Sequence, residues 1–413
     1  MKNGWTGGQF SFYRAVFGSY LLIHFLCLLP WAKEVFSNHG ALPDAGASPL
    51  IHAFPNILAV VDSPIFVEGL ILFAALFSVF FTIGKWDKIA AIGIWYIWAC
   101  LLGRNPLISN PSIPFIGWLL LAHALIPGAP YGARAAVNRV DPAGGWKMPP
   151  LLFLSAWIVM AAGYSYSGYT KLVSPSWVDG TALMRILHNP LARPGFVRDF
   201  LLILPPAFLK MATWGALALE LLFAPLALFR ATRRWIWLAM TMLHLGLVMM
   251  IAFADLTAGM LILHFFTFDP AWVVPLKDSG TARIFYDGHC GLCHRIVRFV
   301  LAEDRSGNTF RFAPLQSEAF QNVLSKEEPA EVPDSVAVET ADGKLLFRST
   351  AALYIFERLG GIWRITAIVF RLVPAALRDV GYDFIARIRY RLFKRPADAC
   401  PLMPPDIRTR FDL

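Results

Sequence analysis

The sequence predicts a bundle of membrane-spanning helices followed by a thioredoxin-like α/β domain. Residues 1–270 hold 17 Lys or Arg and 11 Asp or Glu. Residues 271–413, a segment about half as long, hold 20 Lys or Arg and 17 Asp or Glu. Soluble domains carry roughly a quarter charged residues, so only the second part has a soluble composition. It also holds a Cys-x-x-Cys motif between a short apolar run and a helical pattern. We therefore expect a membrane domain over 1–270, a linker over 271–282 and a soluble domain over 283–413.

The composition of the whole chain excludes two broad classes of protein. Of its 413 residues, 57% are hydrophobic and 16% charged, and the mean hydropathy is +0.54. A disordered chain or a wholly soluble one would carry more charge. The net charge of +9 comes without a basic stripe interleaved with aromatic residues, so we expect no nucleic-acid partner.

Apolar runs of roughly 17–25 residues predict about eight transmembrane helices. They lie near 13–31, 65–84, 88–104, 112–128, 149–168, 207–229, 234–253 and 255–269. Lys and Arg concentrate in the loops that face the cytoplasm if the N-terminus is inside. An even number of spans then returns the C-terminal domain to the cytoplasm. We expect a multi-pass protein of the bacterial inner membrane, with the lipid bilayer as a partner.

Ionisable residues at or near membrane depth are candidates for function because charge is costly there. They are His24, Glu68, His123, Lys171, Glu220, His244 and His264. The simplest role for His24, His123 and His264 is a hydrogen bond between helices. Glu220 and His244 lie deeper, on successive predicted helices. They form either a structural ion pair or a binding site for a cofactor such as a quinone, and the same pattern also fits a transporter.

The segment from Tyr164 to Leu183 carries the most specific pattern of the membrane part. An aromatic residue is followed by Gly-x-x-Lys-Leu and then by Trp-x-x-Gly. This pattern resembles the horizontally transferred transmembrane domain family, which includes the vitamin K-dependent gamma-carboxylases. The matching residues are Gly168, Lys171, Leu172, Trp177 and Gly180.

The resemblance implies that Lys171 is a catalytic base acting on a lipid cofactor. A partly desolvated lysine has a lowered pKa, which suits that role. The alternatives are a lysine that extends from a helix end to the membrane surface, or one paired with Glu220. The vertebrate-type carboxylases carry a large lumenal region after their spans, and this chain carries a different domain there.

The soluble part predicts alternating strands and helices. Their order is a strand at 283–286, a helix beginning at Cys290, a strand at 310–315, a helix at 318–326, a hairpin over 335–349 and a helix at 350–361. The helix after Cys290 follows from apolar residues at helical spacing, and the hairpin from a tight turn at Asp342–Gly343. This order of elements is that of a thioredoxin-like fold.

The placement of the two cysteines predicts thiol chemistry. A thiol reacts as the thiolate, which the start of a helix stabilises. We expect Cys290 to attack and Cys293, one turn later, to resolve the mixed disulfide. Three flanking residues, His289, His294 and Arg295, would lower the thiol pKa further. Asp287 serves either as proton acceptor for the resolving cysteine or as a cap of the turn.

The main alternative is a zinc site. Cys290, Cys293 and Cys400 with His289 or His294 supply four ligands of the right types. A single Cys-x-x-Cys without a second pair is a weak zinc signal, so we predict no metal.

The motif Asp-x-x-Cys-x-x-Cys at Asp287, Cys290 and Cys293 resembles the signature of the DCC family of thiol-disulfide oxidoreductases. The resemblance extends over about 283–412 and includes later blocks such as 389–400. It implies that the partners are protein thiols or disulfides. It also implies that Pro333, before the apolar run 335–338, is the cis-proline that faces the cysteines in such folds.

Residues 363–395 are apolar and basic at once. They form either an interfacial helix on anionic lipid or helices packed on the oxidoreductase domain with arginines outward. We expect the second.

Three functions are consistent with these features. We favour a membrane-bound thiol-disulfide oxidoreductase, a protein-disulfide reductase that exchanges electrons with a quinone or another lipid-phase partner. The second is a carboxylase-like enzyme that uses a lipid cofactor and Lys171 as base. The third is a transporter or anchor with a regulatory redox domain.

Overall fold

The computed structural model describes residues 3–137, 139–252, 254–277, 280–327, 335–393 and 405–412. The chain divides into two compact units. The helical unit comprises Tyr13–Ile126 and Pro149–Phe268. The α/β unit comprises Lys2–Phe12, Pro127–Met148 and Asp269–Leu413, so it gathers two segments from far upstream in the chain.

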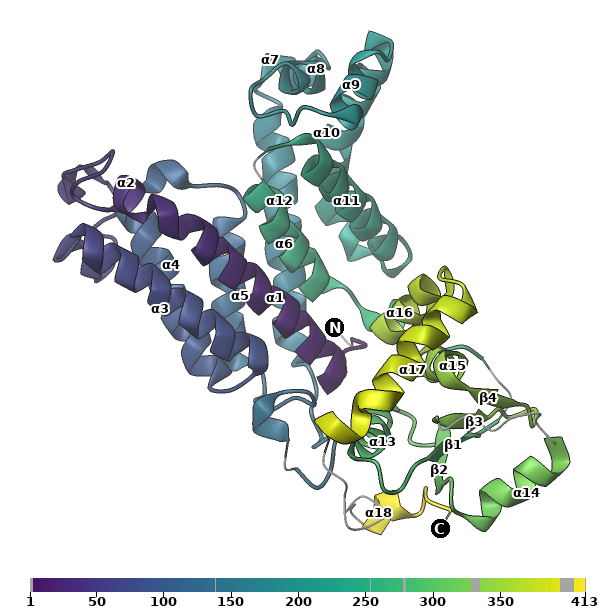
Figure 1. Cartoon of the computed structure of the whole chain (residues 1–413). Coiled ribbons are helices and arrows are strands. Elements are labelled where there is room, and N and C mark those ends of the chain that lie inside the picture. Colours follow the sequence, from purple (N-terminus) through teal and green to yellow (C-terminus); the bar gives the residue numbers. More distant parts are fainter. Residues whose placement is uncertain are drawn as a thin grey trace. The chain divides into compact units, whose positions relative to one another are not determined.

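Within the residues that the structure describes, twelve α-helices form or enter the helical unit, and Figure 1 labels them. They are α1 (Gly7–Leu28), α2 (Ala32–Phe36), α3 (Pro64–Ile83), α4 (Asp87–Arg104), α5 (Ile113–Leu125), α6 (Pro150–Lys171), α7 (Pro175–Val178), α8 (Ala182–Leu187), α9 (Phe196–Leu202), α10 (Pro206–Leu228), α11 (Arg230–Met250) and α12 (Ala254–Thr267). Three of the long helices, α3, α6 and α10, begin with a proline, whose missing N–H costs nothing in the first turn.

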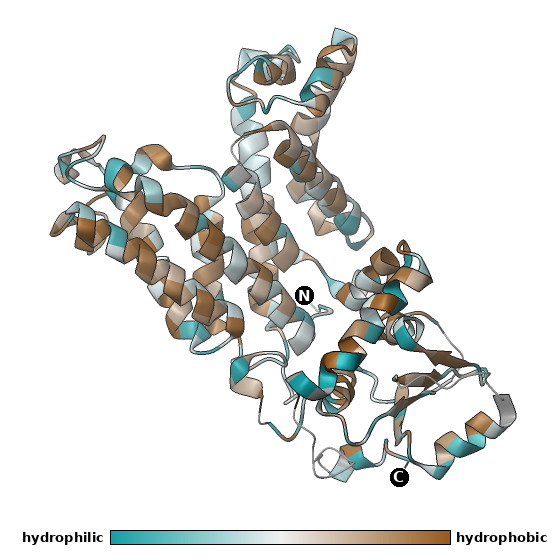
Figure 2. Cartoon of the chain, viewed as in Figure 1, coloured by the Kyte–Doolittle hydropathy of each residue, from teal (hydrophilic) through white to brown (hydrophobic). Residues whose placement is uncertain are grey.

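Each of the eight predicted spans coincides with a helix, but eight spans are not confirmed. Four described helical segments are long and apolar enough to cross a membrane: Gly7–Phe36, Pro64–Ile83, Pro150–Lys171 and Pro206–Leu228. Helices α5 and α12 are apolar but shorter. Helix α4 carries charged residues at both ends and α11 begins with an Arg-rich turn, which shortens their apolar stretches. Apolar residues dominate the long helices in Figure 2.

The α/β unit is built on a four-stranded mixed sheet in the order β2-β1-β3-β4. The strands are β1 (Ala282–Tyr286), β2 (Phe310–Pro314), β3 (Ala337–Glu339) and β4 (Leu345–Phe347). Strand β2 runs parallel to β1, and β3 is antiparallel to both β1 and β4. The helices are α13 (Gly291–Glu303), α14 (Glu318–Glu327), α15 (Arg348–Leu359), α16 (Gly361–Arg371), α17 (Ala375–Leu392) and α18 (Pro405–Arg408). The predicted alternation of strands and helices is therefore observed.

Alternation along the strands gives the sheet two apolar faces. On one face, Ile284 and Tyr286 of β1 pack with Val297 of α13 and Ile355 of α15. On the other face, Phe285 packs with residues of α14. Both cysteines of the motif belong to the first of these clusters, so the site lies under α13 and α15 rather than on the side of α14.

Helix α17 turns polar residues inward, and both α16 and α17 expose apolar residues on their outer side. Asp379 accepts hydrogen bonds from Ser349, and the hydroxyl of Tyr382 accepts one from the amide of Val336 at 3.1 Å. The outward side exposes Ile365, Ile368, Val369, Phe370, Leu372, Val373, Leu377, Val380, Phe384 and Ile385. The helices thus pack on the domain as expected, but not every arginine points outward, because Arg389 is buried, and the outer surface is apolar as well as basic.

The carboxylate of Glu303, the last residue of α13, joins distant segments of the α/β unit. It accepts hydrogen bonds from the hydroxyl of Thr6, the amide of Gly8 at 2.8 Å and the indole N–H of Trp363 at 2.6 Å. Burial raises the pKa of this carboxyl, and these three donors oppose the rise. Because Gly8 lies in the first turn of α1, the carboxylate also satisfies an amide that has no partner within that helix.

Replacing Glu303 with alanine should loosen this junction. Three donors lose a buried charged acceptor, which costs about 2–3 kcal/mol of local stability. Hydrogen–deuterium exchange of the full chain should therefore speed up in peptides covering residues 4–12 and 361–367. Glu318→Ala, at an exposed position of α14, is the matched control and should leave exchange unchanged. Equal exchange in both variants would contradict this role.

Candidate functional site

The candidate site begins where β1 ends. The side-chain Oδ1 of Asp287 accepts a hydrogen bond from the amide of His289 at 2.9 Å, and its carbonyl accepts one from the amide of Cys290 at 3.2 Å. This turn delivers Cys290 to the position immediately before α13. The Cys290 carbonyl accepts the first helical hydrogen bond, from His294 at 3.1 Å. The predicted placement of Cys290 at the start of a helix is therefore observed.

The surroundings of Cys290 favour its thiolate. The thiol of Cys293 is hydrogen-bonded to it, and this is the main cause that lowers the pKa of Cys290 to about 6. Burial acts in the opposite direction. The amides of Leu292 and Cys293 also favour the anion, although neither makes a full hydrogen bond to the Cys290 side chain. This is the electrostatics of a helix start.

Cys293 has the opposite character. Its hydrogen bond to Cys290 and its burial both raise the pKa of the Cys293 thiol well above its ordinary value. Two adjacent thiols share one proton in this arrangement, so the first ionisation belongs to the pair and is best described as lying on Cys290. The asymmetry supports the predicted division into an attacking and a resolving thiol.

Arg389 of α17 is a residue of the site that the sequence reasoning missed. It is 3% exposed, and its Nη2 lies 3.5 Å from Oδ2 of Asp287. Its positive charge lowers the pKa of both cysteine thiols. The available signal was the block 389–400 of the DCC resemblance, which begins at this arginine.

Two of the three flanking residues expected to lower the thiol pKa, His294 and Arg295, have other partners. His294 Nε2 lies 2.8 Å from the carbonyl of Gly288, and the guanidinium of Arg295 stacks over the ring of Phe393 at 4.8 Å. The charged group that stands out as favouring the Cys290 thiolate is Arg389 instead. Asp287 caps the turn, as one alternative proposed, and its carboxylate also faces Arg389.

Both sulfurs lie inside the unit. Cys290 is 1% exposed and Cys293 3% exposed. Thiol–disulfide exchange needs an in-line approach of three sulfurs, so a protein disulfide reaches Cys290 only after local opening of the unit. The two cysteines are free thiols in this structure.

The zinc alternative and the cis-proline both involve residues that the structure does not describe. Over the described ranges, no group of three or more His, Cys, Asp or Glu side chains is placed to hold a metal ion. Cys400, which the zinc site would require, lies outside those ranges, as does Pro333.

A separate polar cluster lies in the helical unit. Lys171 Nζ lies 2.6 Å from Oε2 of Glu220 and donates to the hydroxyl of Ser167 at 2.7 Å. His244 Nε2 lies 2.6 Å from the hydroxyl of Tyr164. Glu220 therefore pairs with Lys171, rather than with His244 as one interpretation proposed. Lys171, Glu220 and His244 do line one cavity of about 720 Å³.

Comparisons with known proteins agree with the geometry of the α/β unit. Residues 284–395 match the family described as DCC1-like thiol-disulfide oxidoreductase. The chain is 39% identical over 129 residues to the uncharacterized protein YuxK of Bacillus subtilis, covering 31% of this chain and 91% of that protein. It is 33% identical over 121 residues to a chloroplastic DCC family protein of Arabidopsis thaliana, covering 29% of this chain and 68% of the relative. No solved structure is significantly similar to the chain.

The fold and the paired thiols define a domain of the thiol-disulfide oxidoreductase class. The chain belongs to the DCC family through this domain. None of these findings tests the resemblance of the helical part to the horizontally transferred transmembrane domain family, which stays a prediction.

The rate at which Cys290 is alkylated should follow its thiolate. In the reduced full chain, labelling of Cys290 by iodoacetamide should rise with pH around a midpoint near 6, because the thiolate dominates above its pKa. Cys293 should stay unlabelled over the same range. Peptide mass spectrometry distinguishes the two sites. A midpoint near the ordinary thiol value of about 8.5 would refute the assigned electrostatics.

Replacing Arg389 with glutamine should move that midpoint upward, since a positive charge that favours the thiolate is lost. Arg295→Gln is the matched control, because its guanidinium stacks on Phe393, and it should leave the midpoint in place. An unchanged midpoint in Arg389→Gln would show that the arginine only holds α17 in place and does not stabilise the Cys290 thiolate.

Proposed function

We propose that this chain is a membrane-anchored thiol-disulfide oxidoreductase whose α/β unit has a thioredoxin-like fold. The observation that carries the proposal is the pairing of a low-pKa thiol, Cys290, at the start of α13 with a high-pKa thiol, Cys293. The sheet order and the position of the cysteines support the fold, and the family match supports the reaction class.

The reaction begins with attack of the Cys290 thiolate on a disulfide of the substrate. A bond forms between Cys290 and one substrate sulfur, the substrate disulfide breaks, and the other sulfur leaves as a thiolate. Cys293 then loses its proton and attacks the Cys290 sulfur, which releases the second substrate thiolate. The substrate gains two electrons, and Cys290 and Cys293 end as a disulfide. The reverse sequence oxidises a substrate dithiol.

Arg389 supports the first step by stabilising the thiolate before attack. Asp287 has two possible roles in the second step. As a turn cap, it holds Cys290 at the start of α13. As a proton acceptor, it takes the proton of Cys293, and its buried position in the turn that precedes Cys290 suits that role.

We further propose that the domain works at the cytoplasmic face of a bacterial inner membrane. The four long apolar helices support membrane anchoring. The exposed apolar face of α16 and α17, with Arg371 and Arg387 among its residues, suits a nearby bilayer surface. A quinone or another lipid-phase partner would then accept or supply the electrons.

The cavity around Lys171 favours one second candidate, a carboxylase-like reaction on a lipid cofactor. Lys171, Glu220, Tyr164 and His244 line a largely apolar space, as a cofactor site requires. The ion pair with Glu220 describes an ammonium group, so Lys171 would have to give up a proton before acting as a base. If neither site has chemistry, the helical unit is an anchor or transporter with a regulatory redox domain.

Single substitutions in the full chain separate these functions. With Cys290→Ser, reduction of a protein disulfide such as that of insulin should fall to background, because the attacking sulfur is gone. With Lys171→Ala it should persist within about twofold. Turbidity of precipitating insulin chains reports the reaction. If Cys290→Ser reduces insulin normally, the proposed function is wrong, and loss only in Lys171→Ala would favour the lipid-cofactor reaction.

The role of Asp287 can be read from Asp287→Asn, which keeps an oxygen to accept the His289 amide but loses the carboxylate. If the carboxylate accepts the proton of Cys293, the mixed disulfide with substrate should accumulate at least tenfold over the native chain. Trapping by acid quench and mass spectrometry measures it. If the mixed disulfide stays at the native level, the residue acts only as a cap. Whichever role is correct, Asp287→Ala should change the rate at which iodoacetamide labels Cys290.

A further inference from the structure

A cavity of about 900 Å³ lies within the helical unit, apart from the Lys171 cluster. Its walls come from α1, α4 and the start of α12, and they are almost entirely apolar. It shares no lining residue with the cavity around Lys171. Its polar groups are few and gather at Asp255, so it has the composition of a binding site for a small amphipathic molecule.

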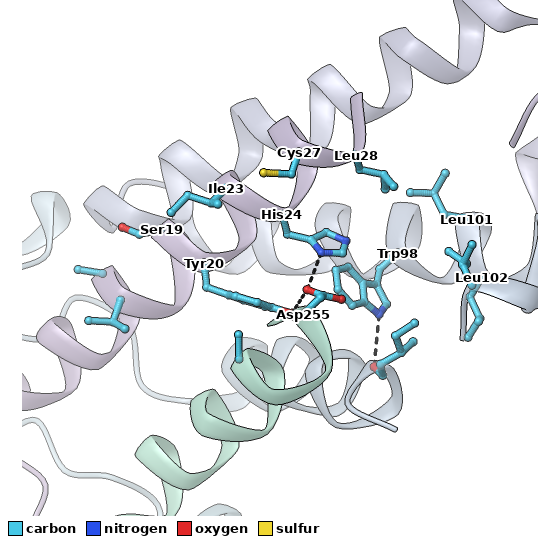
Figure 3. A pocket seen from close by; sticks show the side chains of 15 residues that line it. Ser19, Tyr20, Ile23, His24, Cys27, Leu28, Trp98, Leu101, Leu102 and Asp255 are labelled. Atoms are coloured by element: carbon cyan, nitrogen blue, oxygen red, sulfur yellow. Dashed lines mark hydrogen bonds and ion pairs between the residues drawn. The ribbon is translucent and has the colours of Figure 1, made fainter. Parts of the chain in front are cut away.

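Asp255 is held by donors from three directions. The hydroxyl of Tyr20 donates to Oδ1 at 2.9 Å, and Nδ1 of His24 lies 2.9 Å from the same oxygen. The amide of Asn110 donates to Oδ2 at 3.2 Å. The carboxylate is thus occupied by the protein's own groups, and Figure 3 shows Tyr20 and His24 both turned toward it.

This arrangement fixes the hydrogen-bonding role of Nδ1 of His24. A carboxylate accepts only, so Nδ1 of His24 carries the proton that it shares with Asp255. In the neutral ring, Nε2 is then an acceptor. No described residue donates to it at hydrogen-bond distance. Figure 3 shows this second nitrogen facing away from Asp255, on the side of Leu28 and Leu101, which line the cavity.

The surroundings of His24 favour a ligand with a flat or extended apolar body. The ring of Trp98 lies 4.6 Å from that of His24, centroid to centroid, and its indole N–H donates to the carbonyl of Ile113. The indole therefore offers the cavity mainly its apolar faces. A ligand is fixed by one polar contact at Nε2 and otherwise by burial of apolar surface.

We propose that this cavity binds an amphipathic molecule dissolved in the bilayer, whose hydroxyl group donates a hydrogen bond to Nε2 of His24. A long-chain phenol and a long-chain alcohol share this chemistry. A ketone or an ether of the same shape does not, because each can only accept. The site is independent of the dithiol, and it holds whether or not Cys290 acts as proposed.

The test uses the full chain in detergent micelles and native mass spectrometry. Added 4-dodecylphenol should bind with one molecule per chain. Its methyl ether, which lacks only the donor, should bind about tenfold more weakly, the worth of one hydrogen bond in an apolar site. If dodecanol binds as tightly as 4-dodecylphenol, that result would also support the hydroxyl as the recognised group. Equal binding of phenol and methyl ether would overturn the proposal and leave an apolar groove filled by lipid.

Variants assign the contact to His24. His24→Leu should reduce phenol binding to the level of the methyl ether, whereas the same change at an exposed histidine outside the cavity, His39→Leu, should leave it unchanged. Phenol binding that survives in a folded His24→Leu chain would contradict the assignment. If His24→Leu fails to fold, the comparison of phenol and methyl ether on the native chain still decides. Preferential binding of a ketone, 2-tetradecanone, would also overturn the proposal, because Nε2 would then be a donor.

Discussion

The site of this protein depends on how one proton is shared between two sulfurs. Cys290 and Cys293 are hydrogen-bonded neighbours in an apolar cluster. Two thiolates would repel each other there, and two neutral thiols would not gain the stabilisation that the start of a helix gives to an anion. The pair therefore settles on one anion. The backbone places it on Cys290, since that residue precedes the first turn of α13, and Arg389 adds a fixed positive charge. The rest of the α/β unit holds the two sulfurs in this arrangement and keeps water away from them.

Local patterns in the sequence predicted the elements that depend on local forces. Apolar residues at helical spacing located α13, and the Asp342–Gly343 turn located the hairpin of β3 and β4. The eight predicted helical segments also exist. Whether each crosses a membrane was less predictable, because charged residues at the ends of α4 and α11 leave too short an apolar stretch.

Contacts between distant parts of the chain were not predictable from spacing. Arg389 lies far along the chain from the cysteines, and apart from the family block that begins at this residue, nothing in the spacing around it marks it as part of their site. Glu220 had two proposed partners, His244 on the next helix and Lys171 at a helix end, and it faces Lys171. A lysine at a helix end has a long flexible side chain that reaches a carboxylate on a neighbouring helix, whereas His244 is held by Tyr164. Sequence order could not choose between the two partners because helix packing, not proximity in sequence, decides the pairing.

The carboxylate of Glu303 has a consequence for how the protein is made. The α/β unit needs residues 3–12 and also the strands and helices after residue 280, which are synthesised much later. Everything between these two parts must be synthesised before the unit can close. A fragment cut at residue 283 would lack Thr6 and Gly8 and the segment 127–148. Such a fragment would be a redox domain that lacks part of its own folded unit.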